Sequence, residues 1–200
     1  MSFSLVKLPG LDEQRLLALI SPVLAAHHVA GVELIWRTDQ GGMVLEVTIE
    51  RPTARTPGEG VTVDLCSDVS RDLSTALDVD DLIGARYRLE VGSPGLERAL
   101  YGHGDYERFR GKLAKFKLNA PLASEGPWKG QRVVRGTIFG VAEAGVEVEV
   151  AGGTVLVPEA LIASARLVFD WNASRGQKPS GGRASKKGTH GPVRAKTRSQ

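Results

Sequence analysis

A strand that ends abruptly divides this chain into two regions of different character. In YRLEVGSPGLERAL, residues 87–100, Tyr87, Leu89 and Val91 alternate with charged residues, as in a strand with one buried face. The next four residues are Gly-Ser-Pro-Gly, which suit neither a strand nor a helix interior. Proline fixes its own φ, and glycine permits positive φ. The stretch therefore predicts a sharp turn, with Gly95 the residue most able to take positive φ.

The region before this turn, residues 1–97, alternates helical and strand patterns. Apolar residues recur at helical spacing over 11–28 and again over 64–78, and strand patterns cover a hairpin at 32–51 and a segment at 86–91. Pro22 should kink or divide the first helix. The order α-β-β-α-β predicts an α+β domain in which two helices cover one face of a three-stranded sheet.

The region after the turn, residues 98–171, contains almost only short strands. One short helix is expected over residues 104–112. Five strand patterns follow it, at residues 113–118, 132–141, 145–150, 153–158 and 165–171. Because closure removes exposed strand edges, so many short strands predict a small closed or half-closed β-barrel.

The last segment, residues 172–200, has almost nothing apolar and is predicted to be a disordered basic tail. It carries Arg175 and seven further cations and no acidic residue, whereas residues 1–170 hold 18 basic and 23 acidic residues, a net charge of −5. The overall charge of +3 therefore hides an acidic body with a basic extension. The other seven cations are Lys178, Arg183, Lys186, Lys187, Arg194, Lys196 and Arg198.

Signals for catalysis or for a bound cofactor are scarce. Ser93 does not lie in a G-x-S-x-G elbow, and no acid completes a triad with His103. Cys66 is the only cysteine, which excludes an internal disulfide and a thiolate cage for a metal. We therefore expect no enzyme activity, no cofactor and no metal. The chain shows no secretion signal and no apolar run of about 20 residues, so we expect a cytoplasmic protein.

Signals for nucleic-acid binding are stronger. A flexible polycation gains affinity for phosphates through counterion release, although the tail could also be a solubilising extension. Cations cluster on the first strands of the predicted barrel beside Phe116 and Trp128, as in RNA-binding barrels, although such lysines could simply face solvent. On the first sheet, acidic neighbours dilute the cations. The candidates outside the tail are Arg37, Arg86, Arg88, Arg98, Lys112, Lys115, Lys117, Arg132 and Arg135.

Around the turn the chain resembles the RimP family of bacterial ribosome maturation factors. The family stretch Leu-Glu-Val-x-Ser-Pro-Gly-Leu-x-Arg-x-Leu is matched from Leu89 to Leu100, with Gly92 where another small residue is common. The segment DLCSDVSRDLSTALD resembles the second helix of the family, and VVRGTIFGVAEAGVEVEV resembles its Sm-like barrel. The resemblance covers about residues 10–170 and leaves the tail without a role.

The resemblance implies an assembly factor that binds the immature small ribosomal subunit, contacting its RNA and a ribosomal protein near the decoding centre. It implies no cofactor, no small-molecule substrate and no membrane, and a monomer off the ribosome. The junction motif, Ser93, Pro94, Gly95, Leu96, Glu97 and Arg98, would present Glu97 and Arg98 to a partner or form a structural corner. The alternative is a free-standing Sm-like RNA-binding or chaperone protein, which sedimentation as a ring-sized oligomer would reveal.

Truncation at Asn172 tests whether the basic tail contributes to RNA binding. Each phosphate contact contributes roughly −0.7 to −0.9 to the slope of log K against log salt, and eight cations that engage only in part should contribute about two to four units. A salt titration of RNA binding should therefore give a shallower slope for the truncated protein. Superimposable slopes for the two proteins would make the tail a passive solubiliser.

Overall fold

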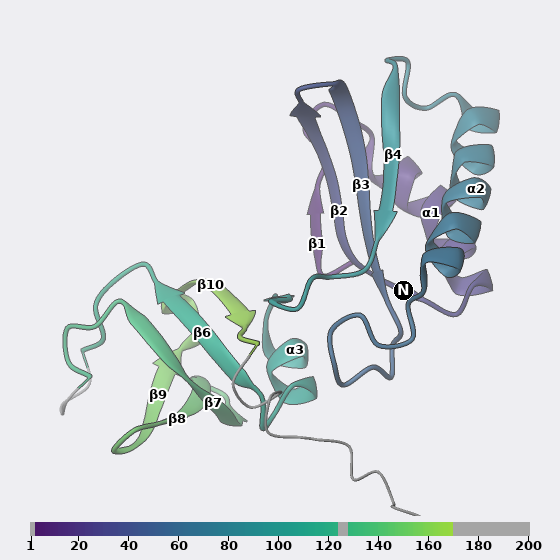
Figure 1. Cartoon of the computed structure of the whole chain (residues 1–200). Coiled ribbons are helices and arrows are strands. Elements are labelled where there is room, and N and C mark those ends of the chain that lie inside the picture. Colours follow the sequence, from purple (N-terminus) through teal and green to yellow (C-terminus); the bar gives the residue numbers. More distant parts are fainter. Residues whose placement is uncertain (1–2, 124–127, 170–200) are drawn as a thin grey trace, which may run out of the picture. The chain divides into compact units, whose positions relative to one another are not determined.

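The computed structural model describes residues 3–123 and 128–169, which form two β-sheets and three α-helices (Figure 1). The first sheet has four strands and the second has six. This architecture confirms the predicted α+β class. The described residues belong to one compact unit, and residues 170–200, which include the predicted tail, lie outside the described ranges. Whether the halves on either side of residue 97 fold separately stays a prediction.

The first sheet is mixed, with strand order β1-β2-β3-β4. An antiparallel β2–β3 hairpin forms its centre, and β1 and β4 lie parallel to their neighbours. The prediction of three strands was wrong, because β1 is too short to show an alternating pattern and is defined only by its pairing with β2. The strands are β1 (Leu5–Lys7), β2 (Ala30–Asp39), β3 (Gly42–Glu50) and β4 (Tyr87–Gly92).

Two helices, α1 (Glu13–Ala26) and α2 (Val63–Asp80), cover one face of this sheet (Figure 1). Side-chain caps begin both helices: the Asp12 carboxylate accepts a hydrogen bond from the N–H of Arg15 at 3.1 Å, and the Thr62 hydroxyl accepts one from Leu65 at 3.2 Å. Pro22 does not divide α1, which runs unbroken through it.

Apolar residues alternate along the strands and recur at helical spacing along the helices. Each element therefore has one apolar side, and these sides pack together. The fully buried members include Leu16, Ile20 and Leu24 of α1, and Val69 and Leu73 of α2. Between these helices and the strands lies one hydrophobic core. The other face of the sheet carries the charged positions of β2, β3 and β4, which are not covered by the helices.

The second sheet is antiparallel throughout, with strand order β5-β10-β6-β7-β8-β9. A short helix α3 (His103–Arg108) lies between β5 and β6 in the chain, and a 3₁₀ turn (Glu159–Leu161) connects the last two strands. Four of the strands follow the predicted segments closely. The fifth, β10, begins three residues before the segment predicted at 165–171 and ends at Leu167, and the two-residue β5 was not predicted. The strands are β5 (Ala99–Leu100), β6 (Leu113–Leu118), β7 (Val133–Ala142), β8 (Gly145–Val150), β9 (Gly153–Pro158) and β10 (Ile162–Leu167).

This sheet curls around a second core but does not close. The buried side chains of its strands pack with Tyr106 and Phe109 of the α3 region. Within the described ranges no ladder joins the edge strands β5 and β9, so the predicted barrel is an open sheet. In the same ranges no helix is long and apolar enough to span a membrane.

Gly136 of β7 is required where two strands approach closely. A Cβ placed at this residue would lie 2.2 Å from the carbonyl oxygen of Glu149 and within 2.7 Å of two valine methyl groups. Gly136→Ala should therefore lower the free energy of unfolding by about 3 kcal/mol or more, because backbone cannot yield as a side chain does. The measurement is urea unfolding of the full chain.

Gly104 in α3 provides the matched control, because a Cβ there would meet open space. Gly104→Ala should leave stability unchanged or raise it by up to about 1 kcal/mol, the difference in helix propensity. Equal unfolding midpoints for Gly136→Ala and Gly104→Ala would show that β7 and β8 can separate at little cost.

Candidate nucleic-acid interface

Three cations form a row across neighbouring strands of the second sheet. Arg166 of β10 lies opposite Lys115 of β6, and Lys115 lies opposite Arg135 of β7. Opposite residues on adjacent strands have Cβ atoms about 5 Å apart, so the row spans roughly 10 Å. The sequence neighbours of these cations, such as Phe116 and Val134, are buried. The row, which we call the cation row, therefore faces away from the core.

Further cations surround the cation row. Lys112, Lys117 and Arg132 are exposed, and the Arg132 guanidinium donates a hydrogen bond to the carbonyl of Asn119 at 2.7 Å. Arg166 lies 3.9 Å from the carboxylate of Glu97, but both side chains are at least half exposed, so this pair is worth little. The structure thus brings all five barrel candidates to one region around β6 and β7 and adds Arg166 to them.

The aromatic partner of these cations differs from the one predicted. Phe116 is fully buried and Trp128 packs partly buried against the second core, so Phe116 cannot stack on a base. Phe139 lies on the same side of β7 as Arg135 and is 58% exposed, and Val133 on that side is 44% exposed. The exposed ring lies four residues along β7 from Arg135, on the same side of the strand, and bases stack on exposed rings of this kind.

The cations of the first sheet lie among carboxylates. Arg37 donates a hydrogen bond to Glu46 at 2.9 Å and also pairs with Asp39 and Glu90, and Arg88 pairs with the same Asp39 and Glu90. The hydrogen bond to Glu46 raises the pKa of Arg37. The backbone N–H of Gln40 and then the arginines lower the pKa of Asp39. Two arginines lie among three carboxylates here, so this face is net acidic and attracts phosphate less than the cation row does.

The other first-sheet candidate, Arg86, is exposed immediately before β4. The tail candidates lie outside the described residues.

The turn after β4 differs in detail from the prediction. Gly95 is not among the described residues with positive φ, and a Cβ there would meet open space, so the expected left-handed glycine is wrong. The turn lies instead at Leu96 and Glu97, and Pro94, two residues before it, is buried. Leu96 and Glu97 are exposed, whereas Arg98 is buried.

Arg98 is held by the last residue of β3. Its Nε and Nη2 groups donate to the two carboxylate oxygens of Glu50, each at 2.9 Å, in a bidentate pair. Nη2 also donates to Asp105 of α3 at 2.9 Å, and Nη1 donates to the carbonyl of Ala99 at 2.7 Å. The side chain of Arg98 is 1% exposed and that of Glu50 is 6% exposed.

A second arginine completes what we call the junction ion cluster, Glu50, Arg98, Asp105 and Arg108. Arg108 donates to Glu50 and to the carbonyls of Arg51 and Ala54, the latter two at 2.8 and 2.9 Å. The guanidinium carbons of both arginines lie about 5 Å from the Phe109 ring centroid. The charges of the two arginines and the two carboxylates in the cluster sum to zero. In the described part of the chain no buried side-chain polar atom lacks a hydrogen-bond partner.

Electrostatics within the cluster keep the arginine charged. Burial alone would lower the pKa of Arg98, but hydrogen bonds to Glu50 and Asp105 outweigh it, so the pKa is raised. Nearby, the Tyr101 hydroxyl donates to Glu33 of β2, and burial together with this bond raises the pKa of the phenol. Arg98, predicted as an RNA contact, is therefore buried and bonded inside the protein instead.

Three features of the site were not found from the sequence. Arg166 was not predicted as a binding residue, although it lies between the buried residues Ala165 and Leu167 in the alternating pattern of β10. Phe139 lies four residues after Arg135 in β7, so the alternation of the strand places both on the same side, and the sequence alone shows this. No sequence pattern indicates the partners of Arg98, because Glu50 and Asp105 lie 48 residues before and 7 residues after it.

In chemical terms the cation row can bind phosphate groups and Phe139 can stack on a base. Within the described residues no group of three or more His, Cys, Asp or Glu side chains could hold a metal ion. A family model described as the RimP N-terminal domain matches residues 19–97, from within α1 to the turn after β4.

Glu50→Gln tests how strongly the junction ion cluster stabilises the protein. Removing one charge from a buried, hydrogen-bonded cluster typically costs 3–5 kcal/mol, because it leaves buried cations uncompensated. We therefore expect the free energy of unfolding to fall by about 3 kcal/mol in urea titrations. Glu46→Gln is the matched control, four residues earlier on the same face of β3 and paired with half-exposed Arg37. It should cost under about 1 kcal/mol, and equal losses in the two variants would contradict a special role for the cluster.

Proposed function

Because the chain belongs to the RimP family, whose role is ribosome maturation, we propose that it acts on the small (30S) subunit by binding precursor RNA. The cation row, Arg166, Lys115 and Arg135, carries this proposal. It is the place in the described residues where cations of three strands adjoin, with Phe139 exposed on the same side of β7.

The cation row and the exposed ring of Phe139 suit RNA by their charge and by their shape. Phosphate contacts from lysine and arginine supply the affinity of most RNA-binding surfaces, and stacking on an exposed ring adds to it without demanding a sequence. The body of the protein is acidic overall, so long-range attraction must come from local cations. The cation row concentrates positive charge on one face, whereas the arginines of the first sheet are paired with carboxylates.

We further propose that the protein acts as a monomer in the cytoplasm and contacts a ribosomal protein near the decoding centre as well as RNA. It acts by binding alone, without a cofactor and without catalysing a reaction. Support for this comes from the absence of a legible nucleophile and base pair in the sequence and from the family.

Neutralising the cation row tests the proposal. The triple variant Lys115→Ala, Arg135→Ala, Arg166→Ala should weaken binding to precursor small-subunit RNA. If each cation contacts one phosphate, the slope of log K against log salt should become shallower by roughly 2 units. The measurement is a salt titration of binding to the precursor RNA, followed by co-sedimentation with precursor subunits.

A second triple variant, Arg15→Ala, Arg55→Ala, Arg71→Ala, changes the net charge equally at exposed sites of the first domain. It should leave the salt slope within about half a unit of the wild type, because these cations lie outside the cation row. A loss of the same size in both variants would show that binding depends on total charge, and the proposed interface would be wrong.

A further inference from the structure

A cavity of about 380 Å³ lies in the second sheet where β5 ends beside β10. The strand β5 pairs with β10 through two residues only, opposite Ala165 and Arg166. The chain then leaves the sheet at Gly102, whose φ of 123° favours glycine. On this side of β10 no described strand pairs with residues 162–164. The shortness of β5 therefore leaves the cavity open along β10.

A buried tyrosine presents a free hydroxyl to this cavity. Tyr106 of α3 is 2% exposed, and its ring packs on Phe116 in the second core with the ring centroids 5.9 Å apart. No hydrogen bond joins its hydroxyl to another described residue. The described residues nevertheless contain no fully buried side-chain polar atom that lacks a partner. The small exposed part of Tyr106 therefore includes the hydroxyl, and the cavity is the space that it reaches.

The second free polar group in the cavity is the carboxylate of Glu159, in the 3₁₀ turn that precedes β10. This side chain is exposed, and no described cation pairs with it. A Cβ at Gly102 would lie 3.4 Å from its Oε1 atom, so the carboxylate lies close to the end of β5. Burial, together with the negative charges of Glu159 and Asp105, raises the pKa of Tyr106 to about 12. The phenol therefore keeps its proton at neutral pH and can donate.

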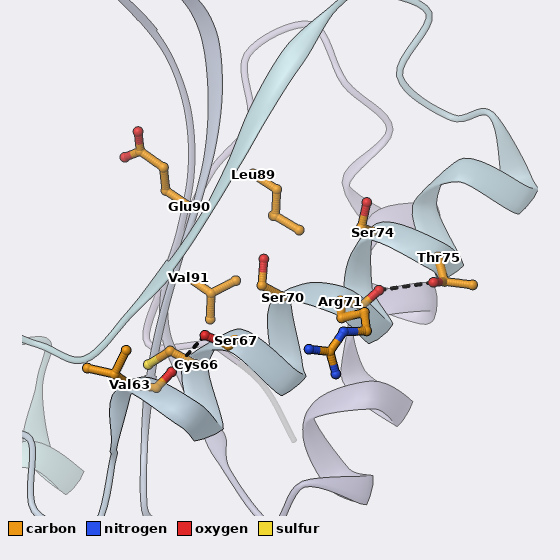
Figure 2. Close-up of a pocket in the computed structure, with 10 residues that line it drawn as sticks. All are labelled: Val63, Cys66, Ser67, Ser70, Arg71, Ser74, Thr75, Leu89, Glu90 and Val91. Carbon is orange, nitrogen blue, oxygen red and sulfur yellow. Dashed lines mark hydrogen bonds between the residues drawn. The ribbon is translucent and has the colours of Figure 1, made fainter.

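The groove between α2 and β4, shown in Figure 2, differs in its polar groups. The hydroxyls of Ser67 and Thr75 donate to carbonyls of their own helix, each at 3.0 Å. Glu90 pairs with Arg37 and Arg88. Most polar side chains of that groove are thus bonded within the protein, whereas the cavity beside β10 offers a free donor and a free acceptor to a ligand.

The cavity adjoins the cation row, because Arg166 belongs to the row and also lines the cavity. Ile162 and Arg166 are four residues apart in β10, which is roughly 13 Å along an extended strand. Glu159 precedes Ile162, so the carboxylate and the guanidinium belong to opposite ends of the β10 wall. A ligand that carries hydrogen-bond donors at one end and a phosphate at the other matches this order, and a nucleotide has both.

We propose that this cavity binds a guanine base of the RNA whose phosphates contact the cation row. The Watson–Crick edge of guanine carries two adjacent donors, the N1–H and the N2 amino group, beside the acceptor O6. A carboxylate can accept from two adjacent N–H groups at once, so Glu159 pairs with both donors while the Tyr106 hydroxyl donates to O6. Adenine, cytosine and uracil lack this adjacent pair of donors, so the carboxylate selects guanine.

The inference deepens the proposed function, and it rests on that function only for RNA as the source of the base. The probes are single-stranded RNA pentamers of uridine with guanosine, inosine or adenosine at the centre, and their binding to the full-length protein is measured by fluorescence anisotropy. Inosine keeps O6 and N1–H but lacks the amino group. Because a hydrogen bond to a charged group is lost, the guanosine pentamer should bind at least about tenfold more tightly than the other two. Equal affinities for the three pentamers, or no binding of any, would overturn the inference.

Glu159→Gln separates recognition of the base from the effect of charge. The variant should bind the guanosine pentamer about tenfold more weakly, while its affinity for the adenosine pentamer stays the same or rises. A carboxylate that only repels RNA would give tighter binding of both pentamers in the variant, and that result would contradict the proposed site. Glu13→Gln makes the same charge change in the exposed first turn of α1. It should leave both Kd values within about twofold of the wild type, because distant exposed charges are screened.

Tyr106→Phe removes the hydroxyl alone. It should weaken the guanosine pentamer about fivefold, and it should leave the urea unfolding midpoint unchanged, because the hydroxyl bonds to no described residue. Free 5′-GMP offers the same base without neighbouring phosphates, so it should bind at least about tenfold more weakly than the guanosine pentamer. Equal affinity of the two would make the ligand a free nucleotide and overturn the assignment to RNA. The cation row is tested separately on precursor RNA, so failure here leaves that proposal standing.

Discussion

The junction ion cluster holds the segment that leads from the first sheet into the second. Glu50 ends the central strand β3, and its carboxylate receives Arg98 and Arg108 from this segment. Burying four charges is costly unless every one is paired, and in the described residues the two arginines and two acids leave no buried side-chain donor or acceptor unmet. The segment from β4 to α3 is therefore held in one conformation by a set of bonds that tolerates few substitutions. Arg98, the arginine of the family motif, therefore stabilises this segment.

The surfaces on either side of this junction differ in chemistry. The second sheet presents cations and an exposed ring, which suits a phosphate backbone and its bases. The first sheet presents arginines that are paired with carboxylates, and the helix α2 that covers its other face carries five aspartates and one arginine.

Local pattern predicted most elements because burial imposes it directly. Alternation placed β6 to β9 almost to the residue, and helical spacing placed α1 and α2 within a few residues. The failures are elements with too little pattern: β1 and β5 are three and two residues long and exist only through their pairing. The prediction that Phe116 lies beside the cations at the surface was wrong for a related reason. Its neighbours are lysines, but the strand turns successive side chains to opposite faces, so the ring enters the core.

Local pattern and one contiguous motif were enough to determine the α+β class, the resemblance to the RimP family and the break at Ser93-Pro94-Gly95. The role of Arg98 emerged only from the folded chain, since its partners come from distant parts of the sequence. The same holds for the cations that act together: Arg166, Lys115 and Arg135 come from three strands and meet only through sheet register. Sheet pairing is non-local, and one residue of slip would send every side chain to the other face, so no single stretch of residues carries that information.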